Sequence, residues 1–361
     1  EFNTPYWFNF HQSDLAHTFV VGPSRTGKSA FMNFLLSQFQ KYRPCQTYIF
    51  DKDYSCRIPT ILQGGQHLDL AGDHGAEISL NPLTLLDDQA DWPWIAQWVS
   101  MLISAKHNMT ATDDKSLWEA IENTSVQPRE HWRLRTLAGF LPSHLHDQLM
   151  RWIGNGPMAR YFDNEEDNFS LGSFTCIEMN RLFDDELLAR AFMDYAFFRI
   201  FKQLKGDPPV IYIEEAWFML KEQRFARKID DWLITLAKKN AFVCMATQSL
   251  QELAGNEIFG TLIDNIPNKI FLPNENALAH IDLYRDKFSL NIQQIERIRT
   301  GIRKRNYYIV TPALSRMVDV SLPKQILAVV RSDDQAQAVF NRHKKKNNDD
   351  WMVGYLEEMC A

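Results

Sequence analysis

One short stretch restricts what this chain can fold into more than any other: Gly22-Pro23-Ser24-Arg25-Thr26-Gly27-Lys28-Ser29. It matches the pattern G-x-x-x-x-G-K-[ST], follows the apolar run 19–21, and leads into residues 30–36, which have helical periodicity. The pattern requires a strand, a tight glycine-rich loop and a helix in direct succession. The chain is therefore expected to contain a strand–loop–helix unit of an α/β fold.

The loop suits the oxygens of a polyphosphate such as ATP. Its glycines let successive N–H groups point inward, and the N-terminus of the following helix adds partial positive charge. Lys28 would reach the β- and γ-phosphates, and the Ser29 hydroxyl would hold Mg²⁺. The alternative, a glycine-rich turn that binds nothing, is disfavoured because all four signature positions are filled. The nucleotide-binding residues are then Gly22, Pro23, Ser24, Arg25, Thr26, Gly27, Lys28, Ser29 and Ala30.

Length and composition set the frame for this loop. With 361 residues, the chain exceeds the usual size of one domain, so we expect a large α/β core with an insertion or appendage. The formal net charge of −6 argues against a chain that is basic throughout. The five cysteines are widely spaced and form no C-x-x-C pair, which favours free thiols over disulfides or a zinc site. No apolar run approaches the roughly 20 residues of a membrane span, so no transmembrane segment is expected in this chain.

Strand and helix signals alternate along the chain, which predicts a mostly parallel, doubly wound sheet. Apolar or β-rich runs occur at 19–21, 47–50, 174–179, 210–213, 242–246, 269–272 and 307–310, with short strands or hairpins expected at the sheet margin between 63 and 86. An amphipathic helix is expected over 185–204.

A helical segment interrupts this alternation from residue 87. Apolar residues there recur at helical spacing, and five tryptophans fall between Trp92 and Trp132. We interpret them as packing of a small helical bundle rather than a platform for a nucleotide. The expected domains are 1–86 as the first part of the core, 87–170 as an inserted helical subdomain, 171–340 as the second part of the core, and 341–361 as a charged C-terminal tail that is solvated and partly disordered.

A second candidate site follows the apolar run 210–213, which ends in Glu214 and Glu215. In P-loop ATPases, an acidic residue at this strand end binds the coordination shell of Mg²⁺, and a glutamate that follows it can polarise the attacking water. Adjacent side chains at a strand end point in different directions, which lets these two roles be divided. We assign Glu214 to Mg²⁺, through water because of its length, and Glu215 to the general base. The alternative is a solvated acidic loop.

The next apolar run, 242–246, leads into Thr247 and Gln248. A glutamine beside the γ-phosphate orients water or reports the state of the nucleotide in other P-loop enzymes. We therefore interpret Gln248 as a sensor, with a polar strand cap as the alternative. The positive side chain that often completes such sites from a neighbouring subunit stays open between Lys238, Lys239, Arg285 and the cluster 297–305, which could equally face nucleic acid.

Taken together, five segments resemble the ATPase domain of the TrbE/CagE group of conjugation and type IV secretion ATPases, within the FtsK–HerA-like P-loop superfamily. They are His17–Pro23 with the P-loop, Phe50-Asp51-Lys52-Asp53, Leu80-Asn81-Pro82-Leu83, Ile213–Trp217 and Ala246–Leu250. These segments extend the resemblance over most of the chain. One departure is Lys238, which stands where relatives carry an arginine and lacks its planar fork.

The resemblance implies a RecA-like P-loop NTPase core with an inserted all-α subdomain. It also implies Mg²⁺-dependent ATP hydrolysis that powers pilus biogenesis and substrate transfer. The expected assembly is a homo-oligomer, a hexamer when complete, working with other secretion components at the cytoplasmic face of a bacterial inner membrane, with an N-terminal domain absent from this chain. Two rivals stay open: a DNA-pumping translocase or coupling protein, and a nucleotide-gated scaffold with little turnover.

Overall fold

The computed structural model describes residues 4–12, 15–42, 44–70, 78–104, 107–204, 207–217, 220, 223–248, 250–251, 257–346 and 349–361. The chain divides into two compact units. A sheet unit comprises Glu1–His67, Gly172–Glu178 and Leu204–Ala361, and a helical unit comprises Leu68–Leu171 and Met179–Gln203.

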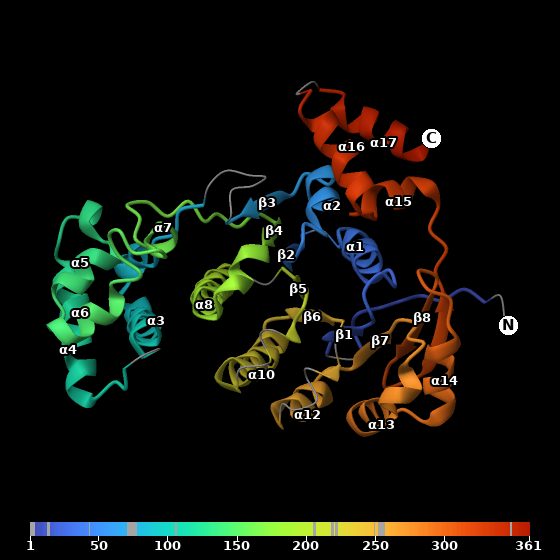
Figure 1. The fold of residues 1–361 in the computed structure, drawn as a ribbon, viewed down its shortest axis with the longest axis horizontal. Coiled ribbons are helices and arrows are strands. Elements are labelled where there is room, and N and C mark those ends of the chain that lie inside the picture. The colour runs from blue at the N-terminus through green and yellow to red at the C-terminus, as the bar shows by residue number, and fades with distance from the viewer. Residues whose placement is uncertain are drawn as a thin grey trace. The chain divides into compact units, whose positions relative to one another are not determined.

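A nine-stranded sheet organises the part of the chain that the structure describes (Figure 1). Across the sheet, the strands are β3 (Gln66–Asp69), β4 (Phe174–Glu178), β2 (Gln46–Asp51), β5 (Pro209–Ile213), β6 (Phe242–Thr247), β1 (Thr18–Val21), β7 (Asn268–Phe271), β8 (Asn306–Val310) and β9 (Ser315–Asp319). From β4 to β7 all neighbours are parallel, and β8 and β9 extend the sheet in antiparallel fashion. The predicted mostly parallel sheet is confirmed, and β9 was not predicted.

Helices cover both faces of the central strands. One side carries α1 (Lys28–Phe39), α2 (Arg57–Leu62) and the C-terminal α15 (Lys324–Val330), and the opposite side carries α10 (Gln223–Lys238), α12 (Glu257–Asp264) and α13 (Ile281–Phe288) (Figure 1). Adjacent residues of β1 show the division: Val20 joins the cluster under α1, whereas Phe19 contacts Phe259 and Phe288 in α12 and α13. Because alternate side chains leave opposite faces of a strand, a continuous apolar run is buried on both sides.

The C-terminal segment contradicts one expectation. Residues 341–361 are not a disordered tail in the part that the structure describes. They include the end of α16 (Asp334–Lys344) and the whole of α17 (Trp351–Cys360). Phe340 and Tyr355 are buried with Ile58 of α2, and the Tyr355 hydroxyl donates to the Ala328 carbonyl at 2.8 Å. The lysine run suggested a solvated tail, but Tyr355 and its apolar neighbours on α17 provide a face to bury.

The helical unit contains the predicted insertion, residues 87–170, within a longer segment, and also takes the helix at 186–203. Its α-helices are α3 (Trp92–Ser104), α4 (Ala111–Ser125), α5 (Leu134–Gly139), α6 (Ser143–Leu149), α7 (Ala159–Phe162) and α8 (Glu186–Gln203), joined by short 3₁₀ turns at Pro82–Asp87, Gln89–Asp91, Arg129–His131 and Asn180–Asp184. Trp98 is fully buried and donates its indole N–H to the Ala191 carbonyl at 3.0 Å. Trp118 is 43% exposed, so the expectation that the tryptophans pack this bundle is wrong for Trp118.

Among its described residues, the sheet unit also has a 3₁₀ turn at Ala277–His280 and α14 (Ile292–Thr300). None of the helices that the structure describes has both the length and the apolar character needed to cross a bilayer.

Candidate active site

The strand order brings the three predicted site segments to one edge of the sheet. β6 lies between β1 and β5, and both pairings are parallel, with Val21 opposite Thr247 and Ile213 opposite Met245. The P-loop, the acidic pair and Gln248 each follow the carboxyl end of one of these strands. Since parallel strands end at the same edge, segments separated by about 190 residues of sequence meet there.

Two glycines of the P-loop are required by the backbone. Gly27 has φ 98°, a left-handed conformation, and a Cβ there would lie 3.2 Å from the Tyr307 hydroxyl. A Cβ on Gly22 would lie 2.5 Å from the Cβ of Leu272, the residue directly after the neighbouring strand β7. The loop is therefore curled tightly against β7 and β8, with α1 starting directly at Lys28. This conformation turns the first N–H groups of α1 toward the loop's concave side.

Lys28 and Glu215 form a buried ion pair. Their Nζ and Oε1 atoms lie 2.9 Å apart, and both side chains are less than a tenth exposed. The second oxygen of Glu215, Oε2, is buried with no hydrogen-bond partner among the described residues. Glu215 also has φ 54°, which is strained for a residue with a side chain, so the surrounding structure holds it there. A buried carboxylate with one free oxygen is suited to accept a proton from water.

Backbone bonds on both sides fix the acidic pair. The N–H of Glu214 donates to the Phe50 carbonyl of β2 at 2.9 Å, and the N–H of Ala216 donates to the Ala246 carbonyl of β6 at 2.9 Å. Glu215 lies between these two anchors. Its position therefore depends on both neighbouring strands as well as on β5.

Glu214 is held by hydroxyls from two different segments. Ser29 Oγ donates to Oε1 at 2.7 Å, and Ser55 Oγ lies 2.5 Å from Oε2. A serine hydroxyl and a carboxylate are the hard oxygen ligands that Mg²⁺ prefers. The predicted pair Ser29 and Glu214 thus fits a magnesium ion by both contact and chemistry.

Ser55 connects Glu214 to Asp51 at the end of β2. Its hydroxyl lies 2.6 Å from Asp51 Oδ1, and the N–H of Cys56 donates to Asp51 Oδ2 at 2.7 Å. Burial raises the pKa of the Asp51 carboxyl well above its usual value, and the nearby charges of Glu178 and Glu214 raise it further. The resemblance drew attention to Asp51, but nothing in the sequence indicated that Ser55 reaches Glu214.

Gln248 contacts the P-loop itself. The Ser24 hydroxyl donates to the side-chain oxygen of Gln248. Gln248 follows β6, which lies between β1 and β5, so this bond connects the end of β6 to the P-loop. The structure therefore brings Lys28, Ser29, Glu214, Glu215 and Gln248 together around one cavity.

That cavity has a volume of about 800 Å³, which is within the size range of small-molecule sites. One wall is formed by the P-loop together with Glu214, Glu215 and Gln248. The sequence did not predict the other wall, which comes from the C-terminal part of the sheet unit: Lys304, Arg305, Tyr307, Val320, Ser321, Leu322, Leu327, Arg331, Ser332 and Asp333. β8 is antiparallel to β7, and β9 is antiparallel to β8, so β8 begins and β9 ends at the edge of the sheet where the P-loop lies. No motif marks these residues.

Aromatic and backbone contacts attach this second wall to the P-loop helix. The Tyr307 ring stacks on Phe31 with centroids 4.0 Å apart and planes 17° apart, and burial raises the pKa of Tyr307 to about 12. The N–H of Lys304 donates to the Thr26 carbonyl at 2.9 Å. The cavity thus combines a phosphate-binding loop with an adjoining aromatic and aliphatic surface.

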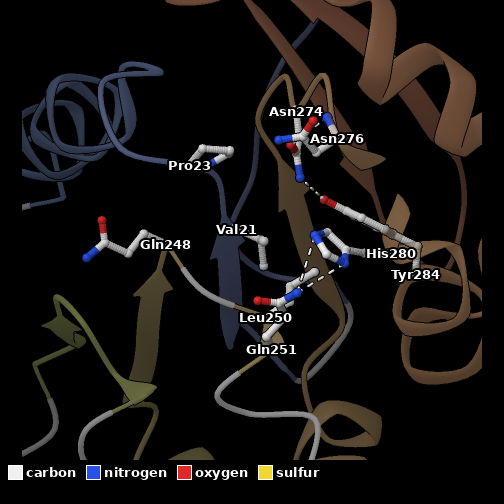
Figure 2. A pocket seen from close by; sticks show the side chains of 9 residues that line it. All are labelled: Val21, Pro23, Gln248, Leu250, Gln251, Asn274, Asn276, His280 and Tyr284. Atoms are coloured by element: carbon white, nitrogen blue, oxygen red, sulfur yellow. Dashed lines mark hydrogen bonds between the residues drawn. The ribbon is translucent and has the colours of Figure 1, made fainter. Parts of the chain in front are cut away.

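A smaller pocket of about 190 Å³ lies on the β7 side of the P-loop (Figure 2). Figure 2 shows Gln251 beside His280, with Gln251 Nε2 3.2 Å from His280 Nδ1, and Asn274 donating to the Tyr284 hydroxyl at 3.0 Å. Gln248 borders both cavities, but Lys28, Ser29 and the acidic pair line only the larger one. The groups suited to phosphate chemistry therefore belong to the larger cavity.

Four of the candidate trans-acting cations form ion pairs within the chain. Arg285 pairs with Asp282 and Asp286. Within the cluster 297–305, Arg299 pairs with Glu296, Arg303 with Glu275, and Arg305 with Asp319, whereas Lys304 lines the cavity of its own chain. Lys238 is exposed at the end of α10. The structure thus places two members of the cluster, Lys304 and Arg305, at the cavity that the P-loop of the same chain lines.

Comparison with known proteins identifies relatives over most of the chain, although no family model matches it. The chain is 32% identical over 364 residues to a probable conjugal transfer protein TrbE of Sinorhizobium fredii, covering 98% of this chain and 54% of that protein. It is 31% identical over 308 residues to the type IV secretion system protein VirB4 of Bartonella henselae, covering 83% of this chain and 39% of the relative. The chain is a homologue of TrbE and VirB4. The predicted resemblance is confirmed, and the chain spans about half or less of the length of these relatives.

Solved structures agree on the fold. VirB4 of Thermoanaerobacter pseudethanolicus superposes with a TM-score of 0.70 at 15% identity, covering 89% of this chain and 94% of that one. The plasmid coupling protein TrwB in complex with ADP and Mg²⁺ superposes with a TM-score of 0.57 at 14% identity, covering 84% and 85%. The predicted RecA-like P-loop NTPase fold is confirmed.

Proposed function

We propose that this homologue of TrbE and VirB4 is the Mg²⁺-dependent ATPase domain of a conjugative type IV secretion system, and that it powers pilus biogenesis and substrate transfer. The observation that carries the proposal is the shared cavity in which Lys28 meets Glu215 and Ser29 meets Glu214. The names of the sequence relatives support the secretion context.

We assign the roles of the site residues as follows. The amides of residues 22–30 and Lys28 bind the phosphates of ATP, and Ser29 and Glu214 hold Mg²⁺, which neutralises phosphate charge. Glu215 accepts the proton of the attacking water through its free Oε2. Gln248 senses the γ-phosphate and passes its state to the P-loop through Ser24. The wall that includes Tyr307 receives the base and ribose.

The proposed assembly is a homo-oligomer, hexameric when complete, that docks on other secretion components at the cytoplasmic face of the inner membrane. In this arrangement, the helical unit is an insertion into the ATPase core. Lys304 is a cis-acting cation for the phosphates, because its backbone is tied to Thr26 and its residue lines the cavity. The ion pairs of Arg299, Arg303 and Arg305 lower the positive potential available for DNA, which favours the secretion motor over a DNA-pumping translocase.

One assay tests the proposal against both rivals: the ATPase rate per chain as a function of protein concentration, with and without single-stranded DNA. A motor that assembles predicts a rate per chain that rises with concentration and depends little on DNA. Lys28→Ala is the matched control and should lose the activity, because the ammonium that binds phosphate is removed. Strong, salt-dependent stimulation by DNA would favour the translocase. Tight ATP binding without turnover at any concentration would favour a nucleotide-gated scaffold.

A further inference from the structure

Three side chains that could ligate a metal meet in the helical unit, within its own residues. His107 lies in the loop before α4, Asp113 lies in the first turn of α4, and His144 lies in the first turn of α6. The Nε2 atom of His107 is 3.0 Å from Asp113 Oδ2, and the Nε2 atom of His144 is 2.7 Å from Asp113 Oδ1. The three potential donor atoms, one from each residue, all lie within 4.8 Å of one another.

The cap of α4 fixes the carboxylate that joins the two imidazoles. Thr110 and Asp113 form a reciprocal capping box, in which the N–H and the hydroxyl of Thr110 donate to Asp113 Oδ2 at 3.0 and 2.9 Å. Oδ2 is thereby anchored to the helix end, whereas the only contact of Oδ1 in this cluster is with His144. Hydrogen bonds from Thr110 thus orient a carboxylate whose two oxygens each contact one imidazole, and outer partners of this kind orient metal ligands in proteins.

Burial decreases across the cluster from the carboxylate outward. The Asp113 side chain is 6% exposed, that of His107 is 29% exposed, and that of His144 is 54% exposed. The exposed imidazole side offers an entry path from solvent.

We propose that His107, Asp113 and His144 form a binding site for one divalent transition-metal ion, Zn²⁺ foremost, with water as the fourth ligand. Two imidazole nitrogens and one carboxylate oxygen make a ligand set suited to Zn²⁺, whereas Mg²⁺ and Ca²⁺ prefer oxygen alone. Tetrahedral bonds of about 2.0–2.1 Å place donor atoms roughly 3.3 Å apart, so the imidazole–carboxylate contacts of 3.0 and 2.7 Å would need to open by about 0.3–0.6 Å. On binding, each Nε2 loses or transfers the proton that now faces the carboxylate.

Such an ion would join three elements of the helical unit. The ligands come from the loop after α3, from α4 and from α6, and His107 and His144 are 37 residues apart in sequence. Closing that loop with a metal stabilises the folded helical unit relative to its unfolded chain. The site is separate from the nucleotide cavity in residues and in chemistry, so it does not depend on the proposed ATPase function.

The test is a Zn²⁺ titration by calorimetry of the metal-stripped chain at pH 8, with excess Mg²⁺ and ADP added to occupy the P-loop. The Cys360→Ser background removes the one partly exposed thiol among the described cysteines. We expect one equivalent of Zn²⁺ per chain, a rise in Tm with Zn²⁺ but not with further Mg²⁺, and visible ligand-field bands of four-coordinate Co²⁺ when Co²⁺ replaces Zn²⁺.

Substitutions separate this site from other ligands in the chain. His107→Gln and His144→Gln should each weaken Zn²⁺ binding more than tenfold and remove the Co²⁺ bands, and Thr110→Val should weaken binding by about 10–100-fold. His146, a partly exposed histidine of the same helix, provides the matched control, and His146→Gln should bind Zn²⁺ as the parent does. Circular dichroism establishes that each variant is folded. The proposal is overturned if the parent binds no Zn²⁺, or if its one equivalent survives both His107→Gln and His144→Gln.

Discussion

At the scale of single residues, the ion pair between Lys28 and Glu215 couples phosphate binding to the proposed base. The two groups lie 2.9 Å apart in a buried setting, so each is the main neutralising partner of the other. A γ-phosphate bound to Lys28 competes with Glu215 for the ammonium and so frees the carboxylate for water. In the proposed mechanism, the phosphate would thus prepare the group that activates the attacking water.

Glu215→Gln tests this exchange directly. The amide keeps the volume of the side chain but carries no charge, so Lys28 is fully available to phosphate and the base is lost. We expect ATP to bind about tenfold more tightly, equivalent to about 1.4 kcal/mol, while hydrolysis falls to background. Equilibrium binding of a fluorescent ATP analogue and a phosphate-release assay measure the two effects. Full turnover in Glu215→Gln would remove Glu215 from the mechanism.

Ser55 supports a second prediction at this scale. Its hydroxyl fixes the Glu214 oxygen that Ser29 does not hold, so Ser55→Ala should leave the carboxylate proposed to hold Mg²⁺ free to turn. A hydrogen bond to a charged group contributes about 1.5–3 kcal/mol, so we expect the Mg²⁺ concentration for half-maximal ATPase activity to rise at least about tenfold. Ser55→Thr should restore it.

Ser37→Ala serves as the matched control, because it removes only the hydroxyl that accepts from Gln63 on the outer part of α1. Its Mg²⁺ dependence should equal that of the parent. A merely structural role for Ser55 would lower the rate of Ser55→Ala while leaving the Mg²⁺ dependence unchanged, which would contradict the prediction.

At the scale of elements, His17 joins β6 to α10 just before β1 begins. Its Nδ1 accepts from the Val243 N–H at 3.1 Å, so its proton resides on Nε2, which donates to the Leu233 carbonyl at 3.1 Å. Burial lowers the pKa of His17 from 6.5 to about 4, because the imidazolium would be desolvated and would face the Val243 N–H. The folded chain therefore keeps His17 neutral where the unfolded chain protonates it.

The effect on stability has a definite sign. Between pH 6.5 and 4 the unfolded state binds more protons at this site, so the free energy of unfolding falls as the pH falls through that range. From pH 7 to pH 5 the contribution of His17 is a loss of about 2 kcal/mol. Urea titrations at both pH values should show this loss reduced in His17→Gln and unchanged in His11→Gln. Equal pH dependence in the parent and His17→Gln would show that His17 is not the titrating group.

The elements that the sequence predicted are those whose signals are local. The P-loop, the central apolar strands and their terminal carboxylates each carry a pattern within a few residues, and parallel pairing then requires them to meet. Ser55, Lys304 and Tyr307 carry no such pattern. Ser55 reaches Glu214 through the turn after β2, and Lys304 and Tyr307 reach the cavity at the start of the antiparallel strand β8. Both placements depend on contacts between segments that are distant in the sequence. The prediction of a disordered C-terminal tail was wrong for the same reason, because the apolar face of this segment is buried only by its contact with α2.

At the scale of the whole molecule, the reactivity of the five free cysteines can be used to measure how the sheet unit unfolds. Cys45, Cys56, Cys176 and Cys244 are buried, and Cys360 near the end of α17 is partly exposed. Burial raises the pKa of Cys56, Cys176 and Cys244. Because the thiolate is the reactive form, these thiols are protected both by their inaccessibility and by their raised pKa. We expect the native chain to react quickly with one equivalent of an aromatic disulfide reagent, and with five after denaturation in guanidinium.

The slow reaction of the buried thiols should show how the sheet opens, because Cys176 and Cys244 lie on β4 and β6 within the central sheet. If that sheet opens only by global unfolding, the two thiols should react at the same rate, and this rate should follow the free energy of unfolding as denaturant is added. Cys360→Ser should abolish the fast phase and leave the slow phase unchanged. Mass spectrometry of partly labelled chains assigns each thiol. A Cys176 that reacts well before Cys244 would show that β4 separates from β2 while β6 stays paired with β1 and β5, so that the sheet would open piecewise rather than as one cooperative unit.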